Sequence, residues 1–190
     1  MNSDRDTGGP RTEAAGVVLA AGAGRRFGRP KAEVLFEGER LVDRAVRLLR
    51  DGGCERVLVV SGAVGLQVDG AVVVHNHEWA GGMGSSLTTG LRAVRENAAV
   101  VVPVDMPWLG PESVRRLLDC GGRVAVAAYG DRSGHPVLIG SEYFAAVAAT
   151  AVGDIGAREF LAANPELVQY VPCEDTGSPD DVDTPQDLIR

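Results

Sequence analysis

Short runs of consecutive apolar residues recur along the chain, and longer segments with apolar residues spaced three or four apart separate them. A run of four to eight apolar residues rich in β-branched side chains is typical of a strand buried on both faces of a sheet. The pattern predicts strands at Gly16–Ala20, Arg56–Val60, Ala71–His75, Ala99–Val104, Arg123–Ala128, Pro136–Ile139 and Val168–Val171.

The intervening segments have the spacing of amphipathic helices. Apolar residues gather on one helix face within Leu41–Leu49 and again within Leu87–Val94. A third helix is predicted to begin at Pro111, because proline is favoured in a first helical turn, and the sequence "ANPEL" (Ala163–Leu167) breaks the chain before the last strand. Alternating strands and helices predict one α/β domain over residues 16–190, with a mostly parallel sheet and helices on both faces.

Composition narrows the class of protein. A pI near 5 and a net charge of −7 argue against general nucleic-acid binding. The three cysteines are far apart, as in a reduced cytoplasmic protein, and no apolar run approaches the ~20 residues of a membrane span. The first fifteen residues are polar and lack the apolar core of a secretory signal, so we expect a disordered tail over residues 1–15.

The most informative segment is "LAAGAGRRFGRPK" (Leu19–Lys31), directly after the first predicted strand. A dinucleotide-binding loop reads G-x-G-x-x-G and has an acid about 20 residues further on. Here the third glycine, Gly28, comes one residue too late, and the next strand leads to Ser61 instead of an acid. A P-loop needs Gly-Lys-Ser/Thr, whereas this loop ends in Gly-Arg-Pro-Lys. The loop therefore matches neither pattern.

The same loop nevertheless has the chemistry of an anion site. Glycines let backbone N–H groups approach a phosphate, and Arg and Lys side chains neutralise its charge. Four of the nineteen Lys and Arg residues fall between Arg25 and Lys31, in an acidic chain. Because ligands of such sheets bind at the carboxyl ends of the strands, we predict a phosphate site here rather than a solvated basic turn.

Two carboxylates are candidate metal ligands. Asp105 follows the very apolar strand of "VVVPVDMPWL", where a carboxylate is costly unless it is paired. A carboxylate beside a phosphate site indicates Mg²⁺, which commonly takes one or two carboxylates together with substrate phosphates. Asp183 lies in "SPDDVDTPQDL" and fits two interpretations equally well, a metal ligand and the cap of a helix that starts at Pro185.

A second Gly-rich loop, "NHEWAGGMGSSLTTGL", leads into the helix that contains Leu87–Val94. Ser85 and Ser86 can cap this helix or donate hydrogen bonds to a ligand. His75 and His77 lack further ligands nearby in the sequence, so we expect them to be structural or exposed to solvent rather than to bind zinc.

Taken together, these segments resemble a known family. The first loop is similar to the triphosphate loop of Rossmann-like nucleotidyltransferases. In order along the chain, "NHEWAGGMGSSL", "PVDMPWLGPESVRRLL", "GHPVLIG", "GDIGAREFL" and "DVDTPQDL" resemble the molybdenum cofactor cytidylyltransferases, and the likeness runs from Val17 to Leu188. It implies a Rossmann-like nucleotidyltransferase domain, Mg²⁺ as cofactor, CTP and the molybdenum cofactor as substrates, and a transient contact with a molybdoenzyme or its chaperone.

The resemblance also implies roles for individual residues. Asp105 and Asp183 would bind the metal, and Arg25 and Lys31 would contact the triphosphate. Arg25, Lys31 and Asp105 would be the catalytic residues, and His135 would lie on the pterin side. The residues expected to bind the nucleotide are Leu19, Ala20, Ala21, Gly22, Gly24, Arg25, Lys31, Ser61, Gly82, Ser85 and Ser86.

We predict that CTP is preferred over GTP, with Ala21 and the Gly82–Ser86 loop as determinants and guanylyl transfer as the alternative. Met106 stands where the family often has Gln, and Met-Pro after the metal-binding Asp also occurs in relatives that transfer guanylyl groups. In those relatives the first loop begins with a sequence like "LAGG", with glycine at the position of Ala21. The methyl group of Ala21 narrows the pocket for a purine. Nucleotidyl transfer to a sugar phosphate also stays open, as does a catalytically silent carrier of the finished cofactor.

Overall fold

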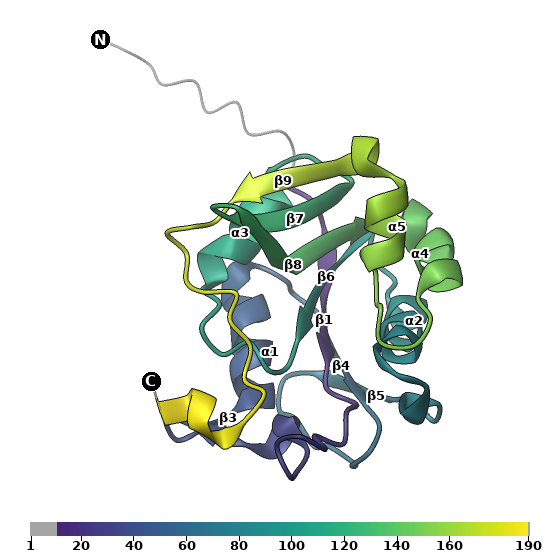
Figure 1. Cartoon of the computed structure of the whole chain (residues 1–190). Coiled ribbons are helices and arrows are strands. Elements are labelled where there is room, and N and C mark those ends of the chain that lie inside the picture. The colour runs from purple at the N-terminus through teal and green to yellow at the C-terminus, as the bar shows by residue number, and fades with distance from the viewer. Residues whose placement is uncertain (1–10, 190) are drawn as a thin grey trace.

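A seven-stranded sheet in the order β5-β4-β1-β6-β8-β7-β9 runs through the protein (Figure 1). The computed structural model describes residues 11–189. The strands of the sheet are β1 (Ala14–Leu19), β4 (Val57–Ser61), β5 (Val72–His75), β6 (Ala98–Pro103), β7 (Val124–Tyr129), β8 (Arg132–Gly140) and β9 (Val168–Pro172). A separate two-stranded hairpin consists of β2 (Leu35–Phe36) and β3 (Glu39–Arg40).

Strand direction determines which residues meet at the edge of the sheet. Strands β5, β4, β1 and β6 are parallel, β8 is antiparallel to both β6 and β7, and β7 is parallel to β9. The carboxyl ends of β1, β4, β5 and β6 therefore share one edge, here called the carboxyl edge. Because β8 runs the other way, its first residues, including His135, lie at the same edge.

Helices cover both faces of the sheet (Figure 1). One face carries α1 (Leu41–Gly52) and α3 (Pro111–Asp119), and the other carries α2 (Met83–Ala93), α4 (Phe144–Thr150) and α5 (Arg158–Ala163). Helices α1 and α3 pack closely, since a Cβ atom at Gly52 would lie 2.4 Å from Cβ of Val114. Short 3₁₀ helices are η1 (Lys31–Glu33), η2 (Trp79–Gly81), η3 (Ser141–Tyr143), η4 (Pro165–Leu167) and η5 (Pro185–Ile189).

Each face of the sheet has its own apolar core. Leu49, Leu117 and Leu138 are fully buried between the sheet and the α1–α3 layer, and Leu87 and Ile139 are buried on the opposite face. Neighbouring residues of one strand, such as Leu138 and Ile139, point into opposite cores because successive side chains alternate across a sheet. This alternation explains why the strands read as continuous apolar runs.

The predicted α/β domain with a mostly parallel sheet and helices on both faces is confirmed, and each of the predicted strands is present. Strand β8 is longer than predicted, since it begins at Arg132 instead of Pro136. Helices α4 and α5, the β2–β3 hairpin and the antiparallel direction of β8 were not predicted from the sequence. Helix α4 gives little sequence signal because "FAAVAAT" is short and alanine-rich, and buries only Val147.

The amino-terminal boundary also differs from the expectation. Strand β1 begins at Ala14, the backbone N–H of Thr12 donates to the carbonyl of Leu118 at 3.0 Å, and Arg11 donates to the carbonyl of Gly52 at 2.8 Å. Residues 11–15 of the predicted tail are therefore part of the fold, and residues 1–10 lie outside the described residues. None of the helices within residues 11–189 has the length and apolar character needed to cross a membrane.

Candidate active site at the carboxyl edge of the sheet

The first Gly-rich loop leaves β1 and turns back tightly over the carboxyl edge. The N–H of Gly28 donates to the carbonyl of Gly24 at 2.8 Å, and both glycines have positive φ angles, 63° at Gly24 and 87° at Gly28. A Cβ atom at Gly24 would lie 1.8 Å from the carbonyl oxygen of Arg29. Only glycine fits this position without distorting the loop. The turn exposes Arg25 and Arg26 to solvent.

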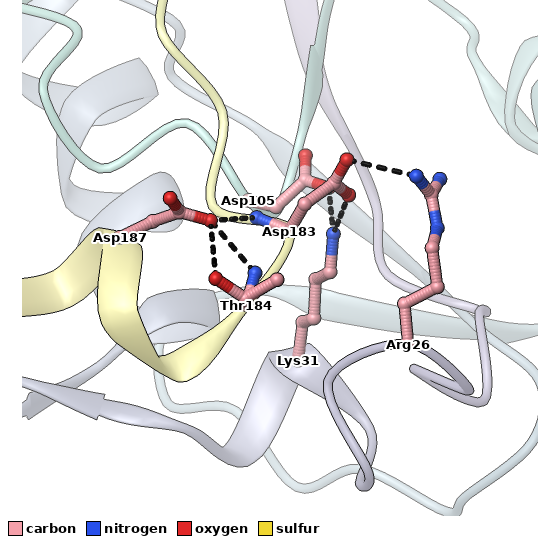
Figure 2. A network of polar contacts seen from close by, with 6 residues as sticks. All are labelled: Arg26, Lys31, Asp105, Asp183, Thr184 and Asp187. Carbon is pink, nitrogen blue, oxygen red and sulfur yellow. Dashed lines mark hydrogen bonds and ion pairs between the residues drawn. The ribbon is translucent and has the colours of Figure 1, made fainter.

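Lys31, at the end of this loop, joins two carboxylates from distant parts of the chain (Figure 2). Its Nζ donates to Oδ2 of Asp105 at 2.9 Å and to Oδ1 of Asp183 at 2.9 Å. Arg26 donates to the other oxygen of Asp183, also at 2.9 Å. The Lys31 and Asp105 side chains are only 15% and 23% exposed, so water screens this pair less than it would screen an ion pair on the open surface.

The electrostatics of Lys31 follow from these contacts. Burial, the largest single influence, lowers the pKa of Lys31, but the hydrogen bonds and negative charges of Asp105 and Asp183 outweigh it and raise the pKa above 10.5. Lys31 is therefore a permanent positive charge at the carboxyl edge. Together with Arg26, which pairs with Asp183, this charge balances the two carboxylates in the absence of a ligand.

Asp183 faces Lys31, and its neighbours stabilise the following turn (Figure 2). Oδ2 of Asp187 accepts hydrogen bonds from the backbone N–H groups of Asp183 and Thr184, at 3.0 and 2.8 Å, and from the Thr184 hydroxyl at 3.0 Å. The Asp187 side chain thus bonds back to the N–H of Thr184, which is one half of a capping box at the start of η5. The capping that the sequence assigned to Asp183 or Thr184 is thus provided by Thr184 and Asp187, and the Asp183 carboxylate points towards Lys31 and Arg26.

A pocket of about 360 Å³ lies beside this ion cluster, between the first loop and the start of α2. We call it the edge pocket. Of the residues predicted from the sequence, those that line it are Leu19, Ala21, Gly22, Gly24, Arg25, Lys31, Gly82, Ser86 and Asp105. Ala20, Ser61, Ser85, Asp183 and His135 are not among its lining residues.

Several lining residues were not predicted from the sequence: Ala23, Arg26, Trp79, Ala80, Met83, Pro103, Val104 and Asp154. Asp154 comes from the loop between α4 and α5, and its carboxylate accepts from the N–H of Met83 at 3.3 Å, at the first residue of α2. An isolated Asp in a loop gives no sequence signal for this long-range contact. Arg26 lies within the recognised loop, but the pattern could not separate it from its neighbour Arg25.

The histidines occupy different environments. His75 and His77 are exposed and stack edge to face with ring centroids 4.6 Å apart, and Nδ1 of His75 lies 3.3 Å from the Ser61 hydroxyl. His135 is partly buried at the start of β8. Burial lowers the pKa of His135 to about 4, and the positive charge of Arg158 acts in the same direction, so this imidazole is neutral near pH 7.

The donor set at the carboxyl edge fits a hard divalent cation. Asp105 and Asp183 both direct carboxylate oxygens at one positive charge, the Lys31 ammonium. Within residues 11–189 no group of three or more His, Cys, Asp or Glu side chains is arranged to hold a metal ion. Two carboxylates are nevertheless sufficient for a cation that takes its remaining ligands from water and substrate phosphates.

Comparison with known proteins agrees with the fold. The MobA-like NTP transferase domain matches residues 16–169, which include the first loop, Asp105 and His135. The crystal structure of Rv0371c from Mycobacterium tuberculosis H37Rv superimposes with a TM-score of 0.77 at 27% identity, over 94% of this chain and 97% of that chain. Fold and site define a nucleotidyltransferase. The chain belongs to the MobA-like NTP transferase family.

Two relatives of known name differ in their coverage. A nicotine blue oxidoreductase of Paenarthrobacter nicotinovorans is 41% identical over 192 residues, which is 92% of this chain and 94% of the relative. A probable molybdenum cofactor guanylyltransferase of Opitutus terrae is 38% identical over 108 residues, or 50% of this chain and 52% of the relative. The match to the second relative thus spans about half of either protein.

Proposed function

We propose that this protein is a Mg²⁺-dependent nucleotidyltransferase that transfers CMP from CTP to the terminal phosphate of the molybdenum cofactor. The products are the cytosine dinucleotide form of the cofactor and pyrophosphate. The observation that carries the proposal is the convergence of Lys31, Asp105 and Asp183 beside the edge pocket. A basic Gly-rich loop and paired carboxylates are what the binding of a metal-bound triphosphate requires.

The reaction needs little proton chemistry from the protein. An oxygen of the cofactor phosphate attacks the α-phosphorus of CTP, a new P–O bond forms, and the bond to the bridging α–β oxygen breaks to release pyrophosphate. A phosphate nucleophile is already ionised near pH 7, so no general base is required. Catalysis then depends on bringing two anions together and on stabilising the charge that develops on the α-phosphoryl oxygens.

Residues of the site divide this work by charge. Asp105 and Asp183 would hold a divalent cation, which would supply further positive charge to the triphosphate. Lys31 and Arg25 supply positive charge to the triphosphate, and the N–H groups of the first loop approach it closely because Gly22 and Gly24 carry no side chains. A manganese complex of Rv0371c, a protein 26% identical to this chain, supports a divalent cation in this fold.

The choice of CTP over GTP rests on the wall of the edge pocket. Ala21 is 5% exposed, and a Cβ atom at Gly62 would lie 2.8 Å from the Ala21 methyl group and 2.4 Å from Cβ of Trp79. The wall is therefore closely packed behind Ala21 and cannot retreat to make room for a larger base. A pyrimidine needs less space than a purine, which favours CTP. GTP is the alternative, because several relatives are named guanylyltransferases.

The test is a competition assay with purified protein, molybdenum-loaded cofactor, Mg²⁺ and equal concentrations of CTP and GTP. We expect pyrophosphate release and formation of the cytosine dinucleotide, and we expect Ala21→Gly to increase use of GTP modestly. Equal formation of both dinucleotides in the wild type would remove the assignment of the base. Nucleotidyl transfer only to a sugar phosphate would replace the acceptor, and cofactor binding without pyrophosphate release would favour a carrier.

A second candidate function comes from the relative that matches nearly the whole chain. Since that relative is named nicotine blue oxidoreductase, we also propose as a candidate function the reduction of nicotine blue. Such a reduction consumes two electrons and requires a donor such as a reduced nicotinamide nucleotide. Incubation with nicotine blue and NADH or NADPH, followed at the absorbance bands of dye and donor, separates the two functions. Loss of both bands without pyrophosphate release would favour the oxidoreductase.

A further inference from the structure

Asn76, which the sequence did not single out, connects the sheet to the second Gly-rich loop. Its side chain is buried, with only 3% of the residue exposed. Its backbone N–H donates to the carbonyl of Ser61 at 2.8 Å, and its Oδ1 accepts from the backbone N–H of Glu78 at 2.9 Å. A backbone N–H can only donate, so this contact fixes which end of the Asn76 amide is the oxygen.

With the oxygen fixed, the amide nitrogen of Asn76 faces two serines of α2. Nδ2 donates to Oγ of Ser85 at 2.9 Å and to Oγ of Ser86 at 3.1 Å. The two protons of the amide are thereby used on two neighbouring hydroxyl oxygens. Each serine accepts one hydrogen bond and retains its own hydroxyl proton to donate.

The two hydroxyl protons have different destinations. Ser85 Oγ lies 2.8 Å from the carbonyl of Gly82 and 2.9 Å from that of Glu78, so its proton is used within the protein. Ser86 lines the edge pocket and is 5% exposed, and within residues 11–189 its hydroxyl proton meets no protein acceptor. A buried hydroxyl that has a partner for its oxygen, but none for its proton, favours a ligand that offers a lone pair.

We propose that Asn76 is a positioning residue that makes the Ser86 hydroxyl a hydrogen-bond donor to the nucleoside half of the bound nucleotide, while Ser85 stabilises the loop. The inference rests on the proposed nucleotide site. The group recognised is a hydrogen-bond acceptor such as O2 or N3 of cytosine. Asn76 touches no ligand in this scheme and acts only through the orientation of Ser86.

The scheme makes a specific statement about hydrogen-bond polarity. In Asn76→Asp the side chain near the serines presents a carboxylate oxygen, which accepts. The Ser86 proton would then turn towards this carboxylate and away from the pocket. Asn76→Asp is therefore expected to remove the donor from the pocket as effectively as Ser86→Ala, although Ser86 itself is unchanged.

The experiment measures the dissociation constants of CTP and GTP with Mg²⁺ by calorimetry, and thermal stability, for Ser86→Ala, Asn76→Asp and the double variant. We expect each single variant to weaken CTP binding by roughly 3- to 10-fold, as for the loss of one hydrogen bond. The double variant should be no weaker than either single variant, because both remove the same interaction. In turnover assays KM for CTP should rise while kcat stays within about twofold.

Two further variants provide the controls. Thr89→Ala removes a hydroxyl one turn further along α2 that bonds only to the carbonyl of Ser85 and lies outside the edge pocket, so binding of CTP should be unaffected. Ser85→Ala should lower the melting temperature and weaken CTP binding less than Ser86→Ala does. If Asn76→Asp does not fold, the comparison of Ser86→Ala with Ser85→Ala still decides.

Three results would overturn the inference. If Ser86→Ala binds CTP as tightly as the wild type, the Ser86 hydroxyl is not a donor to the ligand. If the losses in the double variant are additive, Asn76 does not act through Ser86. If Ser85→Ala weakens CTP binding as much as Ser86→Ala does, the two serines do not have different roles. A wild-type protein that binds neither CTP nor GTP in the presence of Mg²⁺ would overturn the proposed function itself, and this inference with it.

Discussion

Lys31 and Asp105 are 74 residues apart in the sequence, yet Nζ of one lies 2.9 Å from Oδ2 of the other at the carboxyl edge of the sheet. The same ammonium also bonds Asp183, so one cation holds two carboxylates together. In this arrangement the positive charge of Lys31 lies between the two carboxylates before any ligand binds. The four predictions that follow concern this cluster and its surroundings.

Asp105→Asn keeps the shape of the side chain and removes its charge. If Asp105 holds the metal against the triphosphate, turnover should fall about 100-fold or more, on the order of ~3 kcal/mol of transition-state stabilisation. Stability should change little, because Lys31 retains its bond to Asp183. Pyrophosphate release at saturating Mg²⁺ and a thermal melt measure the two effects. Near-normal activity in this variant would exclude Asp105 from the metal site.

Variants of Asp183 and Asp187 should separate metal binding from the capping of η5. Asp183→Ser removes the charge that faces Lys31 and Arg26, so we expect a large loss of rate at an unchanged melting temperature. Asp187→Ala removes the acceptor of three hydrogen bonds at the start of η5, so it should cost about 1 kcal/mol of stability, as for the loss of a helix cap. Normal turnover in Asp183→Ser would leave this residue without a role in metal binding.

Gly24→Ala and Gly22→Ala form a matched pair within the first loop. An alanine at position 24 would bring its methyl group against the carbonyl of Arg29 and would have to adopt a positive φ angle. A methyl group at Gly22 meets no atom within 4 Å. Gly24→Ala should therefore lower the melting temperature, by an amount that corresponds to roughly 1–3 kcal/mol, and Gly22→Ala should not. Equal melting temperatures for the two variants would contradict this account of the loop. Reduced nucleotide binding by Gly22→Ala would show close approach of the ligand.

Stability should depend on pH through His135. Its folded pKa is about 4, against 6.5 for an ordinary histidine, so between these values the unfolded chain binds a proton that the folded protein does not. The free energy of unfolding should accordingly fall as the pH drops from 6.5 towards 4, by at most about 3 kcal/mol. His135→Gln should flatten this dependence in urea denaturation curves, with the exposed His77→Gln as control. An equally steep dependence in both variants would assign the effect to other groups.

The sequence predicted the centre of the sheet well because β1, β4 and β6 are buried along their whole length and therefore read as uninterrupted apolar runs. It predicted the first loop for a similar reason, since glycines and cations are concentrated there against an acidic background. Both signals are local. The direct bond from Lys31 to Asp105 was not predicted, because no local pattern shows that the two side chains meet.

Asp154 and Asn76 illustrate the same limit. The contact between Asp154 and Met83 spans 71 residues, and the bonds from Asn76 to Ser85 and Ser86 depend on the exact direction in which α2 leaves its loop. Such contacts are set by tertiary packing, and Asp and Asn are also common in ordinary turns, so their presence does not predict the contact. The cap at η5 was ambiguous for the opposite reason, since Asp183, Thr184 and Asp187 all suit it chemically.

The bonds that Lys31 and Arg26 donate to Asp183 join segments separated by 152 and 157 residues, the longest spans in the cluster. The segment that carries Asp183 also packs on the rest of the domain, because Val182 is fully buried and its N–H donates to the carbonyl of Asp105 at 2.9 Å. A chain whose sheet is complete but whose C-terminal segment is not yet in place would lack one of the two carboxylates that face Lys31. Cleavage between Pro172 and Asp183 that releases this segment would have the same result. Under the proposed function, nucleotidyl transfer would therefore require the complete chain, since either species would lack one metal-binding carboxylate.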